Sequence, residues 1–220
     1  MGATRPATGR VGRRGRRAGP GLETRERILA GALEVFAEGG FDGATTRDIA
    51  ARAGTNLGLI QYHFGGKERL WREAIDRVFG ALEAALRAVV PEELERPEQL
   101  AEIIRVCVRF VAANPHLVRL MNDECKREGG RMRWLVDRHG RPLYDTAVAL
   151  LEHGRKRGFL PDLAASHAYY LFIGAAGMIF SQAPECRRLT GTDPTTSAAT
   201  IEAHADAMVR LFVRPAVGSP

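Results

Sequence analysis

Two short segments with helical periodicity, joined by a turn of three residues, restrict the fold more than any other feature of this sequence. The first segment, TTRDIAARAG, carries Thr45 and Asp48 at the spacing of a capping box and ends at a glycine. The second segment, LGLIQYH, directly follows Asn56, which is placed to cap a helix. Leu59 and Ile60 are the main apolar anchors of this helix. Two short helices joined by a tight turn form a helix-turn-helix.

Longer helical segments surround this pair. One helix is expected over residues 24–40, where an apolar stripe stops at a Gly-Gly pair, and a long fourth helix is expected over 67–90. Beyond a proline-bracketed linker we expect further helices over 98–113, 116–128, 131–158, 163–182 and 196–213, with a kink at Gly140–Pro142 and a loop over 183–195. Because β-branched runs are scarce, the sequence predicts an all-α fold.

The first 22 residues form a segment of a different kind. Six arginines and no acidic residue precede Glu23, and they account for the whole formal net charge of +6. Such an Arg/Gly segment cannot bury apolar surface, so we expect a disordered basic arm suited to a polyanion; a solvated tail without a function is the alternative.

Several function classes find no support. The three cysteines are widely spaced without a C-x-x-C pair, which argues against disulfides and zinc and favours a reducing cytoplasm. The histidines lack metal-ligand spacing, and the chain has no nucleophile elbow, P-loop, dinucleotide fingerprint or H-E-x-x-H. No window reaches 18 uninterrupted apolar residues. We therefore expect no catalytic residue, cofactor, metal or membrane partner.

The stretch from Thr55 to Leu70, TNLGLIQYHFGGKERL, is unusual for an ordinary amphipathic helix. Small residues allow a close approach to another surface, and Gln61, Tyr62 and His63 offer hydrogen-bonding groups beyond it. The DNA major groove needs both, so we interpret the stretch as a recognition helix. The alternative is that these side chains pack beneath the fourth helix, which we expect for Phe64 but not for all three polar neighbours.

Residues 24–76 resemble the DNA-binding domain of the TetR family of bacterial transcriptional regulators. The resemblance rests on RERILAGALEVFAEGGFDGATTRDIAARAG, the recognition helix and HFGGKERLWREAI in their joint spacing. The family often has Leu-Tyr-His-Tyr-Phe where this chain has Ile60-Gln61-Tyr62-His63-Phe64. Gln61 thus replaces a frequent tyrosine, which favours base reading by its amide over a phosphate contact.

The resemblance implies a DNA-binding domain over 23–76 and a helical effector-binding and dimerisation domain over 77–214. Candidate DNA contacts are Thr46, Arg47, Asn56, Leu57, Gly58, Gln61, Tyr62, His63 and Lys67, the last three as phosphate contacts. In the basic arm RRGRR resembles the centre of an AT-hook, so Arg14 and Arg16 are candidates for the minor groove.

The second domain has two sets of candidates. Small residues and an apolar seam place Gly174, Gly177, Ile201, Met208 and Phe212 at a dimer interface, with packing inside one subunit as the alternative. Large or adaptable side chains suited to a ligand pocket are Met121, Cys125, Trp134, Tyr144, Tyr169, Phe172 and Met178, although a core stripe explains each almost as well.

The expected function is a homodimeric, ligand-responsive regulator of the bacterial cytoplasm, most simply a repressor, which binds a pseudo-palindromic DNA operator and is released by a small-molecule effector. When bound to DNA it is associated with the nucleoid. One alternative is an all-helical small-molecule-binding protein or enzyme with a vestigial DNA-binding domain. Another is a constitutive nucleoid-associated protein, which leaves the large second domain unexplained.

Overall fold

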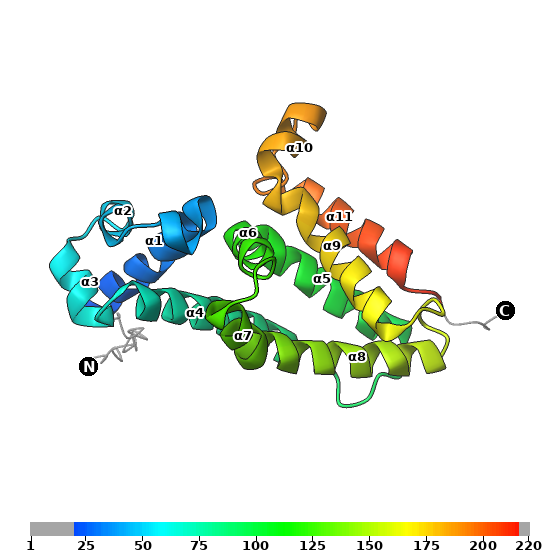
Figure 1. The fold of residues 1–220 in the computed structure, drawn as a ribbon. Helices are drawn as coiled ribbons and strands as arrows, with labels where there is room; N and C mark the ends of the chain where they lie inside the picture. The colour runs from blue at the N-terminus through cyan, green and yellow to red at the C-terminus, as the bar shows by residue number, and fades with distance from the viewer. Residues whose placement is uncertain (1–19, 216–220) are drawn as a thin grey trace, which may run out of the picture.

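The computed structural model describes residues 20–215, and this part of the chain is helical without a strand, as expected (Figure 1). Its helices are α1 (Pro20–Gly43), α2 (Thr46–Arg52), α3 (Leu57–Phe64), α4 (Lys67–Arg87), α5 (Pro97–Ala113), α6 (Pro115–Glu124) and α7 (Gly130–Leu135). A π-helical segment, η1 (Val136–Gly140), leads into α8 (Arg141–Lys156), which is followed by α9 (Ala165–Ser181), α10 (Ala183–Thr190) and α11 (Ala198–Phe212).

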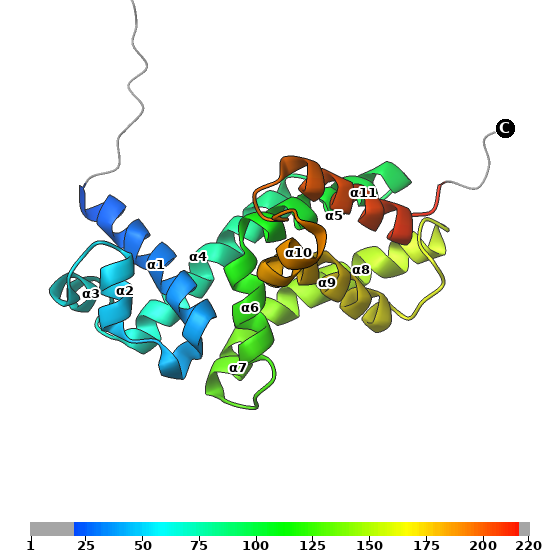
Figure 2. The same ribbon diagram turned by 90° about the horizontal axis from the view of Figure 1, so that it is seen from above.

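Helices α1 and α3 pack on α4, and α2 packs on α1 and α3; together they form the N-terminal unit at one end of the molecule (Figures 1 and 2). Its core contains Ile28, Phe36, Ile49 and Trp71, each at most 1% exposed. The expected end of the first helix at the Gly-Gly pair is confirmed, because Gly40 has a φ of 66° that interrupts α1. The chain therefore changes direction at Gly40, and α2 packs against α1.

Helix α4 continues into the second unit, whose centre is formed by α5, α9 and α11. Val108, Phe180 and Ala205 are fully buried there. Gly177 of α9 faces α6 so closely that an added Cβ would lie 3.1 Å from a methyl carbon of Val118. Helix α6 lies along the C-terminal end of α1, so the two units share one hydrophobic core (Figure 2).

Three local features differ from the sequence expectations. Helix α1 begins at Pro20, so residues 20–22, expected as part of the disordered arm, are helical. The interruption expected at Gly140–Pro142 takes the form of the π-helical segment η1 immediately before α8. Residues 183–190, expected as part of a loop, form the helix α10, which begins with a proline-containing first turn and ends at Gly191 with a φ of 76°.

None of the described helices has the length and apolar character needed to cross a membrane.

Candidate nucleic-acid interface

Helix α3 is an eight-residue helix held at both ends by its own sequence. The Oδ1 atom of Asn56 accepts a hydrogen bond of 3.0 Å from the backbone N–H of Leu59, and Gly65 ends the helix with a φ of 70°. Ile60 and Phe64 are 2% and 0% exposed and anchor one face of the helix in the core. The other face of α3 is consequently presented to solvent in a fixed orientation.

The solvent face of α3 carries the side chains that the sequence singled out. Gln61 is exposed, Tyr62 is 81% exposed, and His63 is half-buried with its ring 5.1 Å from that of Tyr62. Leu57 and Gly58 at the N-terminal end of the helix are also exposed. The expectation that Phe64 packs inward while at least one or two of its polar neighbours project is confirmed.

Helix α2 places a second group of candidates beside α3. Thr45 caps α2 by accepting a 3.1 Å hydrogen bond from the N–H of Asp48, which confirms the cap read from the sequence. Thr46 is half-buried and Arg47 is exposed in the first turn. Ile49 and Ala50 attach the opposite face of α2 to the core. The first turn of α2 is thus fixed, and Arg47 points away from the protein.

The basic side chains of the N-terminal unit divide into paired and unpaired groups. Those bonded to carboxylates are Arg25, Arg52, Arg69, Arg72 and Arg77. The hydrogen bond from Arg52 lowers the pKa of the Glu38 carboxyl, so both groups stay charged. Within the described part of α1 and α2, the guanidinium groups of Arg27 and Arg47 make no ion pair or hydrogen bond. An unpaired, exposed guanidinium is free to meet a phosphate. The sequence did not distinguish Arg27 from its neighbours, because ion pairing between helices is not visible in it.

Lys67 occupies a more enclosed position than a phosphate contact needs. Its ammonium donates a 2.9 Å hydrogen bond to the carbonyl of Ala44 and lies 4.5 Å from the ring centroid of Phe41. Arg14 and Arg16 of the basic arm lie outside the described residues.

Of the seven candidate ligand contacts, the structure brings three together at the junction of α6, α8 and α9. The rings of Tyr144 and Tyr169 meet at 4.9 Å, and Cys125 lies near enough to Tyr169 to influence its ionisation. Burial, with the neighbouring tyrosines and Cys125, raises the pKa of the Tyr169 hydroxyl. Tyr144 lies on α8, Tyr169 on α9, and Cys125 directly after α6.

The other four ligand candidates do not join this group. Met121 and Trp134 pack against the core of the N-terminal unit, and Phe172 packs against the core formed by α5, α9 and α11. Met178 is 56% exposed on the outer face of α9. Sequence periodicity marked all four as apolar but did not indicate which core each one joins.

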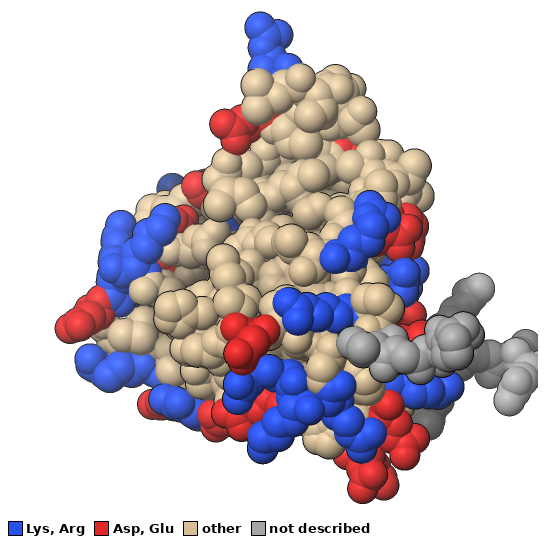
Figure 3. Space-filling model, turned by 90° about the vertical axis from the view of Figure 1, so that its right-hand side faces the viewer, with Lys and Arg blue, Asp and Glu red and all other residues tan. Residues whose placement is uncertain are grey.

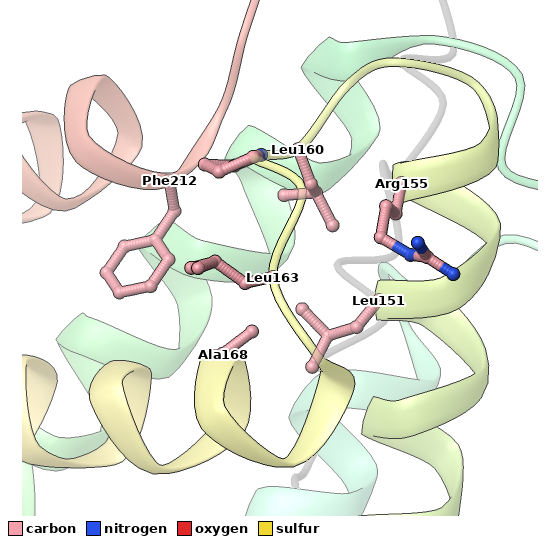
Figure 4. A pocket seen from close by; sticks show the side chains of 7 residues that line it. Leu151, Arg155, Leu160, Leu163, Ala168 and Phe212 are labelled. Atoms are coloured by element: carbon pink, nitrogen blue, oxygen red, sulfur yellow. The ribbon is translucent and has the colours of Figure 1, made fainter.

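A pocket at the far end of α8 is lined by none of the seven candidates (Figure 4). Its walls come from α8, α9, α11 and the loop after α8, and they comprise Leu151, Arg155, Leu160, Pro161, Leu163, Ala168 and Phe212. The enclosed volume is about 10 Å³, which suits about one water molecule. This pocket does not accommodate an organic effector in the observed conformation.

Most of the candidate dimer contacts lie inside the subunit. Met208 and Phe212 are 2% and 7% exposed in the core of α5, α9 and α11, and Ile201 packs against the same core. Gly177 is buried against α6. The assignments of Gly177, Met208 and Phe212 are corrected, because these residues face their own subunit, whereas Ile201 stays partly exposed. Gly174 alone among the five lies on an exposed face, with nothing within 4 Å of an added Cβ.

A different apolar surface is exposed on α9. This 17-residue helix contains no charged residue, and Tyr170, Leu171, Ile173 and Met178 on its outer side are 48–71% exposed. Leu211 of α11 adds an apolar side chain that is 64% exposed. Figure 3 shows a broad area without charged side chains on the side of the molecule where α9 and α11 lie. An uncharged patch of this kind is typical of a protein interface.

Within residues 20–215, no group of three or more His, Cys, Asp and Glu side chains is arranged to hold a metal ion. Cys107 is partly buried, and the packing around it raises the pKa of its thiol to about 12, so this thiol stays protonated.

Comparison with known proteins identifies both units. Residues 28–74 match the model of bacterial regulatory proteins of the tetR family, and residues 97–211 match that of the tetracyclin repressor-like C-terminal domain. The chain is 30% identical over 163 residues to the HTH-type transcriptional repressor NicS of Pseudomonas putida, covering 71% of this chain and 76% of that protein. It is 28% identical over 154 residues to the HTH-type transcriptional repressor KstR2 of Mycobacterium tuberculosis, covering 69% and 77%.

Solved structures share the fold at lower identity. The ketosteroid transcriptional regulator KstR2 of Mycobacterium tuberculosis aligns with a TM-score of 0.67 and 21% identity, over 86% of this chain and 95% of that one. The fatty acid degradation regulator FadR of Bacillus halodurans aligns with a TM-score of 0.62 and 20% identity, over 88% and 97%. Both alignments include the N-terminal unit and the helical second unit.

Proposed function

We propose, since the chain belongs to the TetR family of bacterial regulatory proteins, that this ligand-responsive transcriptional repressor binds a pseudo-palindromic operator as a homodimer. A small-molecule effector bound in the second domain releases it from DNA. The observation that carries the proposal is the solvent face of α3, where Gln61 and Tyr62 project from a helix that is capped at one end and anchored by two buried side chains.

We assign the DNA contacts by the position of each side chain. Gln61 supplies an amide for a base edge in the major groove, and Leu57 and Gly58 allow the helix to approach closely. Tyr62, His63, Thr46 and Arg47 are assigned to the phosphate backbone on either side, and Arg47 is the free cation among them. The Oδ1 atom of Asn56 caps α3, which leaves its amide nitrogen for DNA. Arg14 and Arg16 of the basic arm are assigned to the neighbouring minor groove.

Dimerisation is needed because one eight-residue helix reads few bases. Two recognition helices about 34–36 Å apart read two half-sites that are one helical turn apart. We assign the contact between subunits to the uncharged outer face of α9, with Tyr170, Ile173, Gly174 and Met178, and to Leu211 of α11. These residues replace the seam expected from the sequence.

The effector is assigned to the junction of Cys125, Tyr144 and Tyr169. A ligand there acts by binding more tightly to a conformation that separates the two recognition helices than to the DNA-bound conformation. The site of action is the bacterial cytoplasm. We propose no enzymatic activity, and the alternative of an enzyme or carrier with a vestigial N-terminal domain is not favoured, because both domains match models of regulators.

The test is selection from a random duplex DNA library at near-physiological salt, followed by sequencing of the bound fraction. An inverted repeat with half-sites about one turn or more apart is expected. AT-rich DNA without a repeat would assign binding to the basic arm alone, and recovery of no DNA would contradict the proposal. In a matched pair, Met178→Asp should abolish both dimerisation and selection, whereas Gln61→Ala should keep the dimer and relax the preference at one position of each half-site.

A further inference from the structure

The ring of Phe41, in the last turn of α1, lies against two cations from different helices. The ammonium of Lys67, the first residue of α4, is 4.5 Å from the ring centroid. The guanidinium carbon of Arg131, in α7, is 4.0 Å from the same centroid. Both distances are within the range of a cation–π interaction. One aromatic ring therefore joins the N-terminal unit to a helix of the second unit.

Arg131 is held in this position from its own side. Its Nε atom donates to both carboxylate oxygens of Glu124 at 3.2 and 3.1 Å, and Glu124 is only 9% exposed. A further guanidinium nitrogen lies 3.8 Å from the carboxylate of Asp42, next to Phe41. The Arg131 side chain itself is 26% exposed, so its charge is partly withdrawn from water and its attraction to the ring is stronger than at an open surface.

Lys67 connects the ring of Phe41 to the start of helix α2. Its ammonium donates to the carbonyl of Ala44 at 2.9 Å, and Ala44 directly precedes Thr45, which caps α2. Helix α2 bears Arg47 and packs on α3. This series of contacts links Glu124, Arg131, Phe41 and Lys67. It ends at the Ala44 carbonyl, directly before the residue that caps α2.

We infer that Arg131, a residue of the second domain, is a positioning residue for DNA recognition, which acts through Phe41 and Lys67 on the start of α2. The inference rests on the proposed operator binding and extends it to a residue that does not touch DNA. Helices α7 and α3 lie well apart in both views of the fold (Figures 1 and 2). Without the Arg131 charge the start of α2 is held less firmly, the binding-competent conformation is less populated, and apparent affinity falls by the same factor.

The experiment titrates the full-length protein with its selected operator duplex at several salt concentrations. Arg131→Met keeps an apolar stem and removes the cation, and we expect its affinity to fall by roughly 2- to 30-fold. The slope of log affinity against log salt should stay at the wild-type value, because no phosphate contact is lost. Arg131→Lys should restore most of the affinity. Combining Arg131→Met with Phe41→Leu should weaken binding no further than the stronger single change.

Arg133→Met is the matched control, since Arg133 is an exposed arginine of the same helix, and it should bind as the wild type does. Thermal unfolding of each variant shows that it is folded. Wild-type affinity in Arg131→Met overturns the inference, and so does a slope reduced by about 0.9, which would make Arg131 a phosphate contact. If Arg131→Met does not fold, Phe41→Leu decides: weakened binding with an unchanged slope supports the inference, and unchanged affinity overturns it. A wild-type protein that selects no sequence contradicts the proposed function instead.

Discussion

Replacing Asn56 by Ala is expected to weaken operator binding through the loss of one hydrogen bond at the start of α3. The side-chain oxygen of Asn56 accepts the N–H of Leu59 at 3.0 Å, and this N–H is one of the first-turn donors that have no partner within the helix. Helix α3 has only eight residues, well below the ~12–15 that an isolated helix needs for stability. Its order therefore depends on the cap and on the burial of Ile60 and Phe64.

The magnitude follows from the cap alone. Removal of an Asn cap costs about 1 kcal/mol, with a range of about 0.5–2. If this cost appears as fraying of the first turn of α3, the competent population and the apparent affinity fall by roughly fivefold. Asn56→Ser keeps a cap oxygen but removes the amide, so it separates capping from direct contact with DNA.

The assay is operator affinity, measured by fluorescence anisotropy, alongside the melting temperature for wild type, Asn56→Ala and Asn56→Ser. We expect the serine variant to bind almost as well as the wild type. Equal affinity and equal melting temperature for Asn56→Ala would refute the capping argument. If the serine variant binds as weakly as the alanine variant while both melt normally, Asn56 acts through its amide on DNA.

Three further predictions concern charge, packing and pH. Arg47→Ala should reduce the salt slope of operator binding by about 0.9, whereas Arg52→Ala, which loses a carboxylate-paired cation, should leave the slope unchanged in the same titration. Gly177→Val should destabilise the fold by about 1–3 kcal/mol in urea unfolding, because its Cβ meets a methyl carbon of α6 at 3.1 Å, while Gly174→Val, in open space, should not overpack the subunit. Burial lowers the pKa of His139 below its ordinary 6.5, so the unfolded chain takes up a proton at a higher pH than the folded chain does. Folding stability therefore falls as the pH drops below about 6.5, by at most ~1.4 kcal/mol per pH unit. His139→Phe should make this decline shallower in unfolding measured from pH ~8 to ~5.

The local elements of the DNA-facing unit could be predicted because each depends on residues close together in the chain. Thr45 and Asp48 cap α2, Asn56 caps α3, and Gly40 interrupts α1. Each of these residues lies within one turn of the helix end that it defines. The exposed positions of Gln61 and Tyr62 also followed from the sequence, because three adjacent polar-tipped residues on a short helix cannot share one buried face.

Helix α10 and the pocket candidates were harder to predict for different reasons. The segment 183–190 is short and contains Pro184, so its composition resembles a loop, although proline is compatible with a first helical turn. Among the ligand candidates, Trp134 and Phe172 both read as apolar side chains on helices. Their separation into two cores depends on how α7 and α9 are packed, which helical periodicity does not specify.

The sequence by itself determined the all-α class, the helix-turn-helix and the side chains that project from α3, because periodicity, caps and glycine breaks act over a few residues. Only the tertiary structure decided which apolar stripe faces which neighbour. Met208 of α11 and Tyr170 of α9 are both large side chains on helices of the second unit, yet one is buried in its own subunit and the other is 71% exposed. It also brought Arg131 to Phe41, 90 positions away in the chain. A helical pattern defines a buried face but not its partner, and the partner is set by the packing of the whole chain.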